Sequence, residues 1–318
     1  MADLLASLRI KLFMPRPADV EMVGKPGWQP TGDEQRRQLE QVGENFLIGL
    51  RVGLRGVPTG GIAERFEPIE RQFRGFAYEG CGMGLAVTDS LSLRPHRVAE
   101  YLAGPAGDHV YMAHIGVGWA LARLPRLRWR SVMPADRVQR WLALDGLGFP
   151  QAFFHTTRYV TEMWRPHRYP AWPGDQDYAH RAVDQGIGRA LWFVNGAQPR
   201  ATAACIARFP ETRQADLWSG TGLASVYAGG TDAGGLAELR DLAGRYRPHL
   251  AQGAVFAAKT RQMTGLVTPH TELAVKTHCD ATVAEAAALM DQTGRDLPPD
   301  GPLPGFEVWR SRIQQSFR

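Results

Sequence analysis

A glycine-marked motif recurs along this chain and constrains its fold more than any other feature. Its first glycine stands at positions 43, 80, 116, 146, 186, 220 and 253. The intervals are 37, 36, 30, 40, 34 and 33 residues, with a mean of 35. Self-similarity at such a period is typical of arrays of stacked helix pairs. The sequence therefore predicts an all-α fold of about seven helix-hairpin repeats, forming an α/α superhelix or a closed toroid.

Small residues fall at relative positions 0, +2 and +4 of the motif, as at Gly80, Gly82 and Gly84. On a helix, positions 0 and +4 share one face, whereas +2 points roughly the opposite way. Each glycine costs about 1 kcal/mol of helix propensity relative to alanine. We therefore expect close packing with neighbouring helices on both sides to compensate. A dinucleotide-binding turn would need a preceding strand and a third glycine; the alternative that remains is a run of unrelated glycine loops.

Composition narrows the class of protein. The 318 residues carry a net charge of +5, but the arginines are scattered and no long run of like charge occurs. Nucleic acid is accordingly not an expected partner. Three separated cysteines show neither metal-ligand spacing nor a disulfide framework, which favours a reducing compartment. No signal-peptide layout and no membrane-length apolar run is evident, so we expect a cytoplasmic protein without a transmembrane segment.

Proline and glycine divide the chain into three expected parts. Residues 1–32, with four prolines, predict an irregular arm laid on the first repeat. Residues 33–298 predict the helical-repeat domain, and residues 299–318 a tail that ends in a short helix. Within the domain, Pro134 is expected to open a helix that continues to Asp145, and Pro150 is expected to kink or restart it.

Residues 155–177 interrupt the helical pattern with interleaved aromatic residues, arginines and prolines. Such a stretch could stack nucleic-acid bases or hold an acidic ligand. It could also be a lid over a site, or a long loop packed on the array by its own side chains. The packed loop is the favoured interpretation.

Polar residues recur in the two positions just before the first glycine of most motifs. The position directly before it holds Glu79, Ile115, Asp145, Gln185, Ser219 and Gln252. The position before that holds Tyr78, His114, Leu144, Asp184, Trp218 and Ala251. If these rows line a concave face, they place carboxylates, a histidine, amides and a tryptophan in one groove. Alternatively, the same groups bond to one another inside the helix stack.

The groove hypothesis supplies the candidate site residues. Four titratable groups are the candidates for proton transfer: Glu79, Asp145, Asp184 and His114. The candidates for substrate binding are Tyr78, Gln185, Arg189, Trp192, Trp218, Ser219 and Gln252. No established catalytic motif and no metal site is evident, and the sequence leaves any cofactor unknown.

Six segments together resemble one known family: 74–83, 118–124, 144–149, 184–193, 216–224 and 269–274. They are similar to the UnbL-type family, a bacterial domain of unknown function associated with enediyne biosynthetic clusters. The resemblance covers roughly residues 35–318. It implies a role in secondary metabolism, in converting a linear polyene from an iterative polyketide synthase toward an enediyne core. It supplies neither a reaction nor catalytic residues.

Two functions of different class follow. The first is an enzyme, or an enzyme subunit, that acts on a hydrophobic polyene in a groove lined by polar and aromatic residues. The second is a non-catalytic helical-repeat scaffold that binds other enzymes of the same biosynthetic cluster or shields a labile intermediate. The accumulation of polar residues at the two row positions slightly favours the enzyme.

Overall fold

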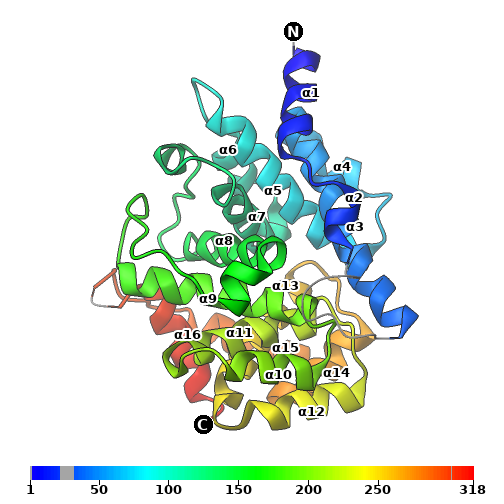
Figure 1. The fold of residues 1–318 in the computed structure, drawn as a ribbon, viewed down its shortest axis with the longest axis vertical. Coiled ribbons are helices and arrows are strands. Elements are labelled where there is room, and N and C mark those ends of the chain that lie inside the picture. The colour runs from blue at the N-terminus through cyan, green and yellow to red at the C-terminus, as the bar shows by residue number, and fades with distance from the viewer. Residues whose placement is uncertain (1, 22–31, 302) are drawn as a thin grey trace. The chain divides into compact units, whose positions relative to one another are not determined.

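The computed structural model describes residues 2–21, 32–301 and 303–318, in which every regular element is a helix (Figure 1). The all-α prediction is confirmed. Contacts divide the chain into two compact units. Unit 1 comprises residues 1–21, 40–147 and 169–173, and unit 2 comprises residues 22–39, 148–168 and 174–318. Helices α3 (Asp33–Arg55) and α8 (Trp141–Phe154) contribute residues to both units.

Unit 1 is built around helices α5 and α7, which pack against each other and against the shorter α6. Short 3₁₀ turns precede α4, α5 and α7. The helices that lie wholly in this unit are α1 (Ala2–Phe13), α2 (Pro17–Val20), α4 (Ile62–Phe66), α5 (Arg74–Ser90), α6 (Arg97–Ala103) and α7 (Val110–Leu121).

Unit 2 has two rows of helices. Helices α9, α11, α13 and α15 are successive neighbours in one row, and α10, α12 and α14 are successive neighbours in the other (Figure 1). The terminal helix α16 packs on α13 and α15. The bounds are α9 (Gln176–Val194), α10 (Pro199–Ala207), α11 (Glu211–Tyr227), α12 (Ala233–Ala243), α13 (Arg247–Met263), α14 (Pro269–Cys279), α15 (Val283–Thr293) and α16 (Gly305–Gln315).

The motif glycines lie where two helix backbones touch. In unit 1, a Cβ on Gly116 would lie 1.9 Å from a carbonyl oxygen of α5, and one on Gly118 would lie 2.0 Å from a carbonyl oxygen of α8. In unit 2, a Cβ on Gly220 would lie 1.9 Å from a carbonyl oxygen of α9, and one on Gly222 would lie 2.1 Å from α13. Position 0 therefore meets the preceding helix and position +2 the following one. Close packing on both faces is confirmed at these glycines.

The expectation of an irregular N-terminal arm is wrong for the residues that the structure describes. Residues 2–13 contain neither glycine nor proline and form α1, and Pro17 starts α2. The side chain of Arg9 bonds α1 to the end of α3, because its Nε donates to the carbonyl oxygen of Leu54 at 2.7 Å. The remainder of the predicted arm, residues 22–31, lies outside the described part.

The predicted helix at Pro134 is also wrong. Residues 134–136 are irregular, residues 137–140 form turns, and the helix begins only at Trp141. Asp136 explains the difference, because its Oδ1 accepts from the backbone N–H groups of Val138 and Gln139 at 2.8 and 2.6 Å and so stabilises a turn. Helix α8 then continues through Pro150 instead of restarting there.

Acid should destabilise unit 2 through His278 of α14, a buried side chain whose Nε2 lies 3.2 Å from Ser225 Oγ. Burial lowers the pKa of His278 to about 3. The native state therefore binds fewer protons than the unfolded chain as the pH falls from about 6.5 toward 3. The free energy of unfolding falls by up to about 1.4 kcal/mol per pH unit in this range.

Urea unfolding at pH 7 and at pH 5 checks this prediction. We expect the free energy of unfolding to fall less between the two values in His278→Leu than in the wild type. His249, whose pKa burial lowers to about 4, contributes a loss of the same sign in both proteins. Equal losses in the wild type and the variant would contradict the assignment to His278.

Candidate ligand pocket of unit 1

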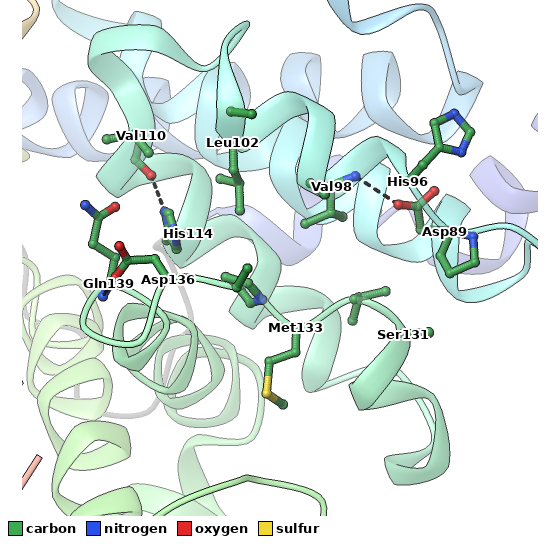
Figure 2. Close-up of a pocket in the computed structure, with 16 residues that line it drawn as sticks. Asp89, His96, Val98, Leu102, Val110, His114, Ser131, Met133, Asp136 and Gln139 are labelled. Carbon is green, nitrogen blue, oxygen red and sulfur yellow. Dashed lines mark hydrogen bonds between the residues drawn. The ribbon is translucent and has the colours of Figure 1, made fainter. Parts of the chain in front are cut away.

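A pocket of about 380 Å³ lies in unit 1 between α6, the first turns of α7 and the segment that leads to α8 (Figure 2). Its volume is in the range of small-molecule sites, about 300–1,000 Å³. The walls are mainly apolar. They include Val98, Ala99, Leu102 and Ala103 of α6, Val110 of α7, and residues 132–135.

Asp89 fixes the wall that α6 forms. This buried residue near the end of α5 accepts the backbone N–H of Val98 on Oδ2 at 2.9 Å, which satisfies a donor in the first turn of α6. The guanidinium of Arg97 lies 3.5 Å from Oδ1. Negative charge is favourable at a helix N-terminus. Asp89 therefore stabilises the position of α6 beside the pocket.

Among the polar groups of this pocket, His114 is the best suited to accept a hydrogen bond or a proton. Its Nδ1 lies 2.8 Å from the carbonyl oxygen of Val110, one turn earlier in α7. A carbonyl only accepts, so the ring proton is assigned to Nδ1 and the lone pair to Nε2. Burial lowers the pKa of His114, and the bond to Val110 and the charge of Asp136 only partly oppose this. The imidazole is therefore neutral at pH 7.

Polar groups gather around His114 at one end of the pocket. Figure 2 shows Asp136 and Gln139 beside it, whereas Asp89 and His96 lie toward the other end, with Val98, Leu102 and Met133 between. The carboxylate of Asp136 is exposed and is oriented by the turn described above. This geometry offers a proton acceptor at the polar end of a mainly apolar pocket, and the charge of Asp136 favours the imidazolium that would form.

Comparison with protein families gives one match. Residues 4–317 match the model of a family described as a protein of unknown function, DUF1702. The chain belongs to the DUF1702 family. Among curated proteins and among solved structures, none matches it.

Of the predicted site residues in unit 1, only His114 lines the pocket. Tyr78 stacks on His109, with ring centroids 4.0 Å apart, and burial raises its pKa. Glu79 Oε1 accepts from the indole N–H of Trp119 at 2.8 Å. Asp145 is buried and interacts with other groups of the protein. Tyr78, Glu79 and Asp145 are thus involved in helix packing and are not lining residues of this pocket.

The structure brings three predicted residues of unit 2 together, inside the row of α9, α11 and α13. Ser219 Oγ donates to Gln252 Oε1 at 2.7 Å and lies 3.5 Å from Gln185 Oε1. The Nε of Arg310, from α16, donates to the same Gln252 oxygen at 3.1 Å. All four side chains are buried. In unit 2 the polar row bonds neighbouring helices to one another, as the alternative interpretation predicted.

The remaining predicted residues of unit 2 are also engaged within the fold. Asp184 accepts from Arg213 Nε at 3.0 Å, and burial raises the pKa of Asp184 to about 6 although Arg213 opposes this. Arg189 lies over the ring of Phe149, 5.2 Å from its centroid. The indole N–H of Trp192 donates to the carbonyl oxygen of Gly229 at 2.8 Å. Trp218 is buried in α11.

Sequence reasoning missed most of the pocket. Asp136 stands in a Pro-Ala-Asp-Arg string that was interpreted as a helix start, although an aspartate two and three residues before its backbone donors is equally typical of a turn. The apolar wall of α6 carries no motif glycine, and no pattern in the sequence marks it as part of a site. Among the described residues, no cluster of three His, Cys, Asp or Glu side chains could hold a metal ion.

Proposed function

We propose that this DUF1702 protein binds a small, mainly apolar molecule in the pocket of unit 1, with His114 as its hydrogen-bond or proton acceptor. The observation that carries the proposal is a neutral imidazole, with its lone pair assigned to Nε2, in the wall of a pocket whose other lining residues are mainly apolar. A group that must release a proton to the protein, such as a hydroxyl, would find its partner there. An enzyme that uses this arrangement would be a proton-transfer catalyst with His114 as general base.

The class of ligand is proposed from the resemblance to the UnbL-type family. That resemblance supports a conjugated polyene intermediate of secondary metabolism, of the kind an iterative polyketide synthase releases on the way to an enediyne. Such a molecule is apolar along most of its length, as the walls of the pocket are. We also propose that the helix rows continue as a superhelix or a toroid of hairpins, on which partner enzymes of the same pathway could assemble.

A non-catalytic scaffold is the second candidate. It is supported by the Gln185–Ser219–Gln252 row, because those polar groups are used between helices instead of facing a ligand. Arrays of packed helices commonly serve as extended binding surfaces. Partner binding that persists when the pocket is blocked would favour this function.

Fluorescence titration with all-trans-retinol, a polyene alcohol, and with its methyl ether tests the ligand proposal. In the ether a methyl group replaces the hydroxyl hydrogen, so the ether lacks the O–H donor. We expect the alcohol to bind about tenfold more tightly than the ether, the equivalent of about 1.4 kcal/mol for one hydrogen bond. In His114→Phe the two affinities should become equal, because the acceptor is gone.

Blocking variants on α6 provide the matched control. Ala99 is exposed and lines the pocket, whereas Glu100 is exposed and does not. We expect Ala99→Trp to abolish binding of both probes and Glu100→Trp to leave it unchanged. Binding that survives Ala99→Trp, or no saturable binding of either probe by the wild type, would overturn the proposal.

A further inference from the structure

A short surface segment of unit 2, residues 157–168, concentrates cationic and aromatic side chains. The arginines at 158, 165 and 168 are exposed, as is His167, and Trp164 is 37% exposed. Glu162 is the one acidic residue of the segment. None of the three arginines forms an ion pair with any residue that the structure describes. We refer to residues 157–168 as the basic loop.

The exposed groups of the basic loop are held in a fixed arrangement. The guanidinium of Arg158 lies 3.7 Å from the ring centroid of Trp164, a stacked cation–π geometry. Tyr159 meets the same indole edge-on at 5.5 Å. The loop starts as a π-helix, Thr157–Thr161, and the backbone N–H of Trp164 donates to the carbonyl oxygen of Arg158 at 2.9 Å. π-helical turns occur frequently at functional sites.

Two core helices fix the backbone of the basic loop. Arg213 of α11, which pairs with the buried Asp184, also donates from Nη1 to the carbonyl oxygen of Met163 at 2.9 Å. His180 of α9 bonds through Nε2 to the carbonyl oxygen of Pro166 at 2.9 Å. Between these contacts Met163 has a φ of +53°, a conformation that costs a non-glycine residue free energy and persists only where its surroundings enforce it.

We propose that the basic loop is a docking surface for an acidic segment of a partner protein. Arginine guanidinium groups bind carboxylates in bidentate geometry, and arginine and tryptophan dominate binding energy at protein interfaces. Because the loop is already ordered, little conformational entropy would be lost on binding. Nucleic acid is less suited, since Arg158 covers one face of Trp164 and leaves at most the other for base stacking.

Fluorescence anisotropy with three labelled probes tests this inference on the full chain. The probes are a peptide of alternating glutamate and leucine, the same peptide with glutamine in place of glutamate, and a single-stranded DNA oligonucleotide of equal charge. We expect the acidic peptide to bind more tightly than the other two. The double variant Arg165→Glu/Arg168→Glu should weaken that binding by at least about tenfold, because attraction is replaced by repulsion.

The control is Arg65→Glu/Arg295→Glu, which changes the net charge equally at two exposed arginines outside the loop. We expect it to alter the affinity less than twofold, and Trp164→Ala to reduce it without any change of charge. If both double variants lost the same affinity for the acidic peptide, net charge alone would explain the binding, and the proposal would be overturned. Tighter binding of DNA than of the acidic peptide, or no binding of the peptide at low salt, would overturn it as well.

Discussion

Replacing Gly220 by alanine adds one methyl group and should strongly lower the free energy of unfolding of unit 2. The new Cβ would lie 1.9 Å from the carbonyl oxygen of Gln185 and 2.7 Å from the backbone nitrogen of Arg189. Both are backbone atoms of α9, so no side chain can turn away and the two helices must separate. Overpacking typically costs about 1–3 kcal/mol and occasionally more; contact with backbone atoms puts this variant at the upper end, a large share of the roughly 5–15 kcal/mol that stabilises a typical domain.

Gly234→Ala in α12 is the matched control for this variant. Gly234 is an exposed helical glycine, and its added Cβ would approach only Asp232 Oδ1, at an ordinary 3.4 Å. Here alanine should stabilise the protein by up to about 1 kcal/mol, through helix propensity and a less flexible unfolded chain. Urea unfolding of the two variants should therefore shift in opposite directions. Similar stabilities would show that the α9–α11 crossing tolerates a wider separation.

The helix crossings could be predicted from the sequence because a glycine inside a helix carries a known cost. Only close backbone approach compensates for it, and the spacing of 0 and +2 directs that approach to two sides. Gly116 and Gly118 accordingly meet α5 and α8, and Gly220 and Gly222 meet α9 and α13. The glycine spacing makes no prediction for α1 and α6, which contain no motif glycine and are joined to their neighbours by side-chain hydrogen bonds, among them those of Arg9 and Asp89.

The candidate site was harder to predict because a polar residue on a helix has two possible uses. His114 and Gln185 occupy neighbouring positions of the same motif, yet one lines a pocket and the other bonds to Ser219 between helices. Which of the two uses applies depends on the groups that surround each side chain in the fold, and those groups lie far away in the sequence. Arg310, which completes the buried row of unit 2, is 58 residues from Gln252. No local sequence pattern predicts this contact.

Replacing Arg310 by methionine should destabilise unit 2 by about 3–5 kcal/mol, the usual result when one partner of a buried ion pair is removed. Its guanidinium is fully buried and lies 2.8 Å from Asp216, 3.0 Å from Glu307 and 3.3 Å from the hydroxyl of Tyr178. Burial alone would raise the pKa of Asp216, but the charges of Arg310 and Arg181 hold it below its ordinary value. Without Arg310, two buried carboxylates share Arg181 alone.

Arg312→Met is the control on the same helix. Among the described residues, Arg312 bonds only to backbone carbonyls in the 293–296 segment, so its replacement should cost about 1 kcal/mol or less. The pH dependence separates lost charge pairing from lost packing. In Arg310→Met the stranded carboxylates should acquire raised pKa values, so their protonation should stabilise the variant relative to the wild type as the pH falls from 7 toward 5, while the loss through His278 is common to both. In the wild type the lowered pKa of Asp216 allows no such gain. The difference in unfolding free energy between the two proteins should therefore narrow at pH 5, whereas a cavity left by the missing guanidinium would keep it constant.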